Sequence, residues 1–319
     1  MTGNKPELRS TRRNVDLHTD QMDDAIDEWC QRYLGSAPVE RLFTTHHLSI
    51  VEGLRLADGR AVVVKVRPGR PRLAGCHAVH QHVWYNGFPC PQPLTKPLPF
   101  GGDRVASAES LMAPGDDPAP SVEAYADLLA RLIRLAPPVS EVPSLDPAPA
   151  WLHWYHHHPG VWPPPDDRDA DLNSHPASAW LDDIGRLARQ RLAGLAEPPV
   201  IGHGDLEPHN VQWVDGRPWA VHDWDSVVAE PEAIIVGHCA AMWRACAPDW
   251  GSTTDEVAEF LDAYQHAAGR SFSPDEVEAC WASGLWVRAF NAKKASLDGL
   301  TLLDRGEAER RLRLAGMRP

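Results

Sequence analysis

The chain carries the sequence Ile-Gly-His-Gly-Asp-Leu-Glu-Pro-His-Asn at residues 201–210, and this segment holds most of its recognisable chemistry. A short predicted hairpin follows, with two arms of similar length joined by a turn at Asp215-Gly216. Because the arms match in length, we expect Asn210 and Asp223, at the two open ends of the hairpin, to lie side by side.

These polar residues are suited to phosphoryl transfer. An amide oxygen and a carboxylate oxygen placed together are hard ligands of the kind that Mg²⁺ prefers. Asp205 precedes Asn210 on the same tight loop, where it could accept the proton of an alcohol that attacks a metal-bound phosphate. A simpler interpretation, with Asp205 as a turn former and Asn210 as a loop cap, stays open on these residues alone.

The motif His203-Gly204-Asp205-Leu206, with Asn210 five residues after the aspartate, resembles the aminoglycoside phosphotransferase family. The later His-Asp-Trp-Asp at 222–225 fits the same resemblance, which extends over residues of about 40–295. It implies an α+β, protein-kinase-like fold with a small β-rich lobe and a larger, mainly helical lobe. It also implies Asp205 as catalytic base, with Asn210 and Asp223 as Mg²⁺ ligands that also contact ATP.

The first half of the chain resembles the nucleotide-binding lobe of such kinases. A hairpin with a turn at Asp58-Gly59 is predicted, and its return strand places Lys65 on the face opposite Val64. The resemblance gives Lys65 the role of holding the α- and β-phosphates of ATP. It also places the segment that contacts adenine near Glu109 and Leu111.

The organisation expected from the sequence is a loose tail over residues 1–20, a nucleotide-binding lobe over 21–115 and a catalytic, acceptor-binding lobe over 116–319 with its catalytic loop at 201–225. The first 115 residues have 14 basic and 12 acidic residues, whereas the rest have 17 and 32, a net charge of −15. This acidic half disfavours nucleic acid and mildly favours a cationic small molecule.

Periodicity predicts the other elements. The predicted elements are a helix at 20–34, a helix at 73–87, strands within 94–112, a helix from 121, an irregular insertion at 137–178, a helix at 179–196 and further helices from 233. Capping boxes are predicted at Thr253 and Ser273. The helix with Trp281 and Phe290 is interpreted as core.

The sequence departs from the kinase pattern in three places. No Asp or Glu lies between Gly59 and Gly102, so the helix at 73–87 lacks an acid to pair with Lys65. Thr and His residues at 44–49 replace a glycine-rich phosphate loop, and Ile234 stands where the family has an anchoring Asp.

Three functions follow for comparison. The first is an ATP- and Mg²⁺-dependent small-molecule kinase that phosphorylates a hydroxyl of an aminoglycoside-like compound or a metabolic alcohol or sugar. The second is a non-catalytic nucleotide-binding module of the same fold, motivated by the three departures. The third, ranked lowest, is a metal-dependent phosphoesterase that uses His203, Asp205, His209, His222 and Asp223.

Composition limits the remaining classes. No apolar stretch reaches the length of about 18 residues that a membrane span needs, and no apolar run follows Met1. The six cysteines are scattered, without a Cys-x-x-Cys pair, which predicts reduced thiols and a cytoplasmic location. A histidine cluster at 153–158 lacks a local acid or cysteine, so a metal site is not expected there.

Overall fold

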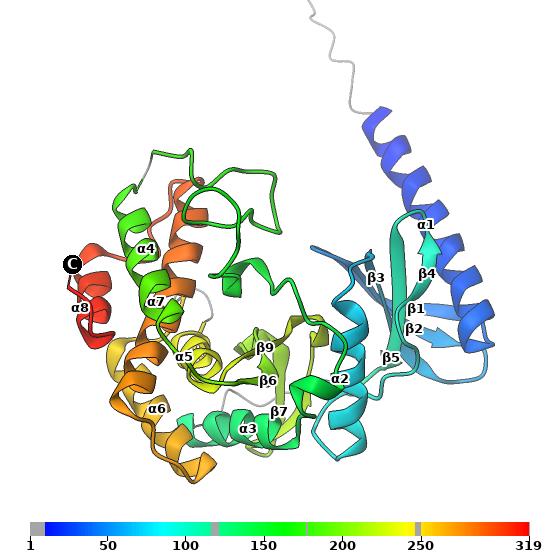
Figure 1. Ribbon diagram of the computed structural model, residues 1–319. Coiled ribbons are helices and arrows are strands. Elements are labelled where there is room, and N and C mark those ends of the chain that lie inside the picture. The colour runs from blue at the N-terminus through cyan, green and yellow to red at the C-terminus, as the bar shows by residue number, and fades with distance from the viewer. Residues whose placement is uncertain (1–9, 116–120, 177, 246–249, 319) are drawn as a thin grey trace, which may run out of the picture. The chain divides into compact units, whose positions relative to one another are not determined.

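The computed structural model describes residues 10–115, 121–176, 178–245 and 250–318, and for residues 10–20 it describes the backbone only. The chain forms two compact units (Figure 1). Unit 1 takes residues up to 69 together with 93–111, and unit 2 takes 70–92 together with 112–319. The predicted α+β division into a strand-rich and a helical part is confirmed. The helix predicted at 73–87, which the sequence analysis places in the first lobe, belongs to unit 2.

Unit 1 is built on an antiparallel sheet with strand order β1-β2-β3-β5-β4. The side chains of Val62, Val64 and Val66 are at most 1% exposed, so the predicted alternation of β3 is confirmed. Gly59, in the turn between β2 and β3, has a φ of 89°, which glycine adopts without strain. The strands are β1 (Pro38–His46), β2 (Ile50–Leu56), β3 (Ala61–Pro68), β4 (Leu98–Gly101) and β5 (Arg104–Ser110).

Helix α1 (Ser10–Leu34) packs on this sheet through Ile26, Trp29 and Cys30. The predicted loose tail is wrong for residues 10–20, which are helical. Neither glycine nor proline interrupts the chain from Ser10 to Leu34, so nothing in the sequence stops the helix earlier. Residues 1–9 lie outside the described part of the chain.

Unit 2 is mainly helical, with two small two-stranded sheets. Its helices are α2 (Leu73–Tyr85), α3 (Val122–Leu135), α4 (Trp180–Ala193), α5 (Glu232–Met242), α6 (Thr254–Ala268), α7 (Pro274–Ser296) and α8 (Arg305–Leu314). Its strands are β6 (Pro199–His203), β7 (Val211–Val214), β8 (Arg217–Val221) and β9 (Val227–Pro231). None of the helices in the described ranges is long and apolar enough to span a lipid bilayer.

Helices α5 and α7 form the centre of unit 2. Both predicted capping boxes, at Thr253 and Ser273, are present. Trp281 and Phe290 of α7 are 5% and 0% exposed, which confirms their interpretation as core. Glycine is required at position 237 of α5, where α5 crosses α7, since a Cβ there would lie 2.1 Å from the backbone oxygen of Cys280 in α7.

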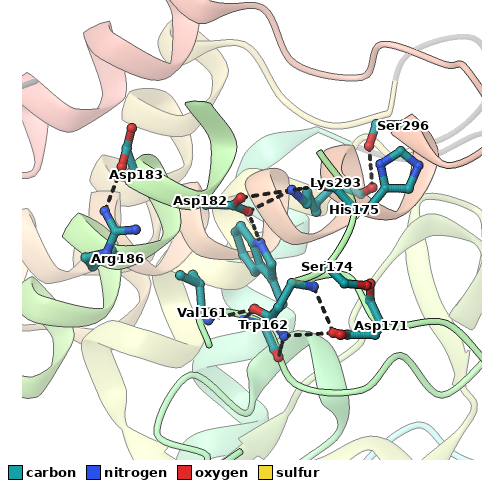
Figure 2. Close-up of polar contacts among 11 residues, drawn as sticks. Val161, Trp162, Asp171, Ser174, His175, Asp182, Asp183, Arg186, Lys293 and Ser296 are labelled. Atoms are coloured by element: carbon teal, nitrogen blue, oxygen red, sulfur yellow. Dashed lines mark hydrogen bonds and ion pairs between the residues drawn. The ribbon is translucent and has the colours of Figure 1, made fainter. Parts of the chain in front are cut away.

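The segment 137–178 contains two short 3₁₀ turns, η1 (Val139–Glu141) and η2 (Ala150–Leu152), and no longer element among its described residues. A buried ion pair fastens it to the helices, as Figure 2 shows. Lys293 of α7, whose side chain is fully buried, lies 2.8 Å from Asp182 of α4 and donates to the backbone oxygen of His175. The indole of Trp162 donates to the same carboxylate at 2.6 Å.

Candidate active site

The loop after β6 is held close to the chain that follows the hairpin. The Gly204 N–H donates to the Ser226 oxygen at 2.7 Å, and a Cβ on Gly204 would lie 2.4 Å from Leu152 Cδ1. The Trp151 indole donates to the Gly204 oxygen at 2.7 Å. Glycine is therefore needed here because backbone and side chains approach from both sides.

His203 fixes the loop through hydrogen bonds of both ring nitrogens. The Asp205 N–H donates to His203 Nδ1 at 3.1 Å, so the ring proton is assigned to Nε2, which donates to the His222 oxygen at 3.0 Å. The side chain is completely buried. These contacts make His203 an anchor of the loop rather than an acid or base.

Asp205 and Asn210 are joined directly. The Asn210 amide nitrogen donates to the Asp205 backbone oxygen and to its Oδ2, each at 2.8 Å. Because the nitrogen is committed to Asp205, the amide oxygen Oδ1 is turned to the other side, as a cation ligand requires. The backbone turn that makes this contact is the 3₁₀ turn η3 (Pro208–Asn210).

The predicted hairpin is present and brings the next residue of interest to Asn210. Strands β7 and β8 pair antiparallel, and the His222 backbone N–H donates to the backbone oxygen of Asn210 at 2.8 Å. Asp223 follows with a φ of 58°, a left-handed conformation that is uncommon for a residue other than glycine. Its Oδ2 accepts a hydrogen bond from Ser226 Oγ at 2.6 Å, which helps to hold this conformation.

Glu207 and His209 share the loop with Asp205. Of these two, only His209 was a candidate site residue from the sequence. Burial, and then the Asp205 charge, raise the pKa of Glu207 to about 9. His209 Nε2 lies 3.8 Å from Asp205 Oδ2, and its Nδ1 lies 3.6 Å from Glu207 Oε2. Their alternation at 205, 207 and 209 was the available sequence signal.

Helix α2 is attached to the segment that follows Asp223. Arg72, just before the helix and 5% exposed, donates to the backbone oxygens of Asp225 and Val227, and to that of Leu145 at 3.2 Å. Sequence reasoning missed this residue, because an arginine beside a helix start is usually exposed.

His80 on the same helix makes a second attachment. Its ring stacks on Trp224, with centroids 4.8 Å apart and planes 6° from parallel. Its Nε2 lies 2.8 Å from the Pro91 oxygen. Helix α2, which carries no acid, is thus fixed within unit 2 by Arg72 and His80.

Ile234 is completely buried in α5, where the family resemblance would place an anchoring Asp. One turn along α5, His238 is also buried. Burial, and then the neighbouring His203, lower the pKa of His238 to about 3, although an interaction with the Gly204 backbone acts in the opposite direction. His238 is therefore neutral. The hydrogen bond from the Trp151 indole to the Gly204 backbone oxygen anchors the loop, and Ile234 leaves no carboxylate at this position.

Three of the predicted nucleotide-binding residues, Lys65, Glu109 and Leu111, lie in unit 1. Lys65 sits on β3 opposite Val51 and Ser107, and is half-buried. Glu109 of β5 pairs with Val63, and the Leu111 N–H donates to the Ala61 oxygen at 3.0 Å. The Leu111 N–H is thus already used inside the sheet, so an adenine contact there would fall to backbone oxygens or neighbouring residues.

The histidine cluster at 153–158 has structural contacts. His156 Nε2 lies 3.0 Å from the Val161 oxygen, and His153 meets the Tyr155 ring edge-on. Burial lowers the pKa of both histidines. Among the described residues, the group of three that could together hold a metal ion is Asp205, Glu207 and His209.

Comparison with known proteins identifies the family of the chain. A model of the phosphotransferase enzyme family (APH) matches residues 54–280, well over half of the chain. No curated protein gives a significant match.

Solved structures share the fold at low sequence identity. A complex of the amicoumacin kinase hAmiN with AMP-PNP, Ca²⁺ and Ami has a TM-score of 0.61 at 12% identity, covering 88% of this chain and 87% of that one. Spectinomycin phosphotransferase with ADP and spectinomycin has a TM-score of 0.56 at 11% identity, covering 92% of each chain. An aminoglycoside phosphotransferase from Alicyclobacillus acidocaldarius has 0.52 at 13%, covering 90% and 91%. The family match and the shared fold agree, and the chain belongs to the phosphotransferase enzyme family.

Proposed function

We propose that the protein transfers the γ-phosphoryl group of ATP, with Mg²⁺, to a hydroxyl of a small molecule. In this reaction the acceptor oxygen forms a bond to the γ-phosphorus, the bond from that phosphorus to the β–γ bridging oxygen breaks, and ADP leaves. The acceptor proton passes to Asp205. The observation that carries the proposal is the double hydrogen bond from the Asn210 amide to Asp205, which orients a base and a metal ligand together.

The residues present fit a magnesium ion. The orientation of the Asn210 amide leaves its oxygen for a cation, and Asp223 next to the hairpin end supplies a carboxylate. When bound, Mg²⁺ would neutralise charge on the transferring phosphates. Asn210 and Asp223 would hold this ion and, through it, the nucleotide.

Lys65 is proposed to bind the nucleotide phosphates, and the backbone around Glu109 and Leu111 to contact adenine. Two of the structural relatives were solved with AMP-PNP or ADP, which supports a nucleotide as co-substrate. The substitution Lys65→Met should weaken Mg-ATP binding about 10-fold by calorimetry. Lys96→Met, at an exposed lysine of the same unit, is the matched control.

The acceptor is proposed to bind against the segment 137–178, which touches the catalytic loop through Trp151. A cavity of about 130 Å³ in unit 2 is lined in part by Ser144, Asp146, Tyr155 and Ala229. The Tyr155 hydroxyl donates to Asp146 at 3.0 Å, so the polar side of this cavity is acidic. These features favour an acceptor with a cationic group.

The test is transfer of labelled γ-phosphate to a panel of aminoglycosides, sugars and amino alcohols. Asp205→Asn should lower the rate about 100-fold or more. Asp215→Asn, in the exposed hairpin turn, should leave the rate unchanged because its left-handed backbone also suits asparagine. A loss of only a few-fold at Asp205 would contradict its assignment as the base.

A nucleotide-binding module without turnover is the second candidate. The observation that favours it is the sequence of helix α2, which contains no Asp or Glu. Tight Mg-ATP binding by calorimetry, together with no transfer to any acceptor of the panel, would support it over the kinase. The phosphoesterase hypothesis is less favoured because the family match is to phosphotransferases.

A further inference from the structure

We propose that Asp205, Glu207 and His209 form a binding site for a divalent transition-metal ion of the Zn²⁺ type, separate from the proposed Mg²⁺ ligands. The inhibition argued below rests on the proposed function, whereas the metal binding does not.

The geometry brings one ligand atom of each residue together. The three atoms lie within 4.8 Å of one another. The residues alternate along a loop that is fixed by Pro208 and by the hydrogen bonds from Asn210 to Asp205. The Asp205 and Glu207 side chains are 19% and 15% exposed, and that of His209 is 61% exposed. The exposed imidazole can therefore close onto an ion that the two carboxylates hold.

The ligand set distinguishes this site from the Mg²⁺ ligands. Mg²⁺ takes oxygen ligands almost exclusively and keeps several waters. An imidazole nitrogen with two carboxylate oxygens suits Zn²⁺, Mn²⁺ or Fe²⁺ better. Three protein ligands with an open position are also the usual composition of zinc sites that exchange water.

The charge at the loop also favours a cation. The Asp205 and Glu207 side chains are held together in partly buried positions. A divalent ion between them attracts both carboxylate groups and supplies the interactions that burial removed.

Occupation of the site has a consequence for the reaction. An ion bound to Asp205 occupies the oxygens that would accept the acceptor proton. It also competes with the Asn210 amide for Oδ2. Zn²⁺ should therefore inhibit phosphoryl transfer, even when Mg²⁺ is in large excess.

Calorimetric titration of the full chain with ZnCl₂ in Mg²⁺-containing buffer, without nucleotide, tests the site. We expect one site on the unaltered protein, weakened at least about 10-fold in Glu207→Gln and in His209→Ala. His158→Ala, at an exposed histidine elsewhere in the unit, is the control for adventitious binding and should leave the site intact. Asp223→Asn should also retain it.

An isotherm that Glu207→Gln and His209→Ala leave unchanged would overturn the proposal. Circular dichroism of each variant shows whether it folds, and visible absorption of Co²⁺ added to the unaltered protein, displaced by Zn²⁺, gives a second readout without substitution. Absence of a cobalt band would also count against the site. Failure of the proposed kinase activity would leave both measurements in force, so the two failures are distinguishable. If transfer is observed, Zn²⁺ should inhibit it at concentrations at least about 10-fold lower in the unaltered protein than in His209→Ala.

Discussion

The guanidinium of Arg72 donates a hydrogen bond to the backbone oxygen of Val227, 155 residues further along the chain. The same side chain also donates to the backbone oxygen of Asp225, so its hydrogen bonds reach two positions in the turn that follows Asp223. Since Asp223 has a left-handed backbone, its position depends on such external restraints. Arg72, just before helix α2, thereby helps to fix the position of a proposed metal ligand.

Arg72→Ala should destabilise unit 2 and weaken magnesium-dependent nucleotide binding. Three backbone oxygens, two of them buried and that of Asp225 partly buried, would lose a donor, which costs about 2–4 kcal/mol of unfolding free energy. Urea unfolding measures this cost. Arg70→Ala, at an exposed arginine two residues earlier, is the control, and equal effects of the two substitutions would contradict the role given to Arg72.

Gly204→Ala should abolish the close contact on which the catalytic loop depends. The added Cβ would meet Leu152 at 2.4 Å and the Ser226 oxygen at 3.0 Å, and overpacking of this kind costs about 1–3 kcal/mol. Because the loop must shift, transfer activity should fall more than stability. Gly194→Ala, where the nearest atom is 3.4 Å away, should be tolerated. The measurements are thermal unfolding and phosphate transfer.

Lys293→Met should lower the unfolding free energy by about 3 kcal/mol, because Asp182 loses its buried cationic partner. The matched control is Arg186→Met, one turn along α4, which breaks a pair whose side chains are 63% and 72% exposed. That change should cost below about 1 kcal/mol. Both pairs are visible in Figure 2. Similar losses in the two variants would show that burial of Lys293 does not matter.

Glu230→Gln should make stability less dependent on pH. Burial is the largest cause that raises the pKa of Glu230, to about 8, so the folded protein keeps its proton where the unfolded chain loses it, above about pH 4.5. Stability of the unaltered protein therefore falls as the pH rises from about 4.5 to 8, by up to about 1.4 kcal/mol per pH unit from this group. Urea unfolding at pH 5.5 and 7.5 should show a smaller fall in unfolding free energy for Glu230→Gln than for the unaltered protein. The control Glu141→Gln, at an exposed residue, should show the same fall as the unaltered protein.

Local pattern was sufficient for much of this fold. The hairpin turns at Gly59 and Gly216, the two capping boxes and the apolar stripe of α7 depend on residues near in sequence, and all were predicted correctly. The loop with Asp205 and Asn210 and its hairpin were predicted for the same reason, since the motif and the turn lie within about 20 residues.

Apart from the helical residues 10–20, the errors concern contacts between distant parts of the chain. Strand β9, which pairs with β6, was not predicted, because its register depends on Gly202 and Val228 meeting across 26 positions. Arg72 and Glu207 were missed for a related reason. Burial of a charged side chain is set by tertiary packing, and nothing in the local sequence indicates it.

The contact between Asn210 and Asp205 has a practical consequence. Both hydrogens of one side-chain amide point at a single residue, one at its backbone oxygen and one at its carboxylate. The two ¹⁵N–¹H resonances of that amide should therefore be resolved from each other and respond separately when the carboxylate is protonated or coordinates an ion. A nuclear magnetic resonance titration of this one group would follow the state of the catalytic loop in the absence of any acceptor.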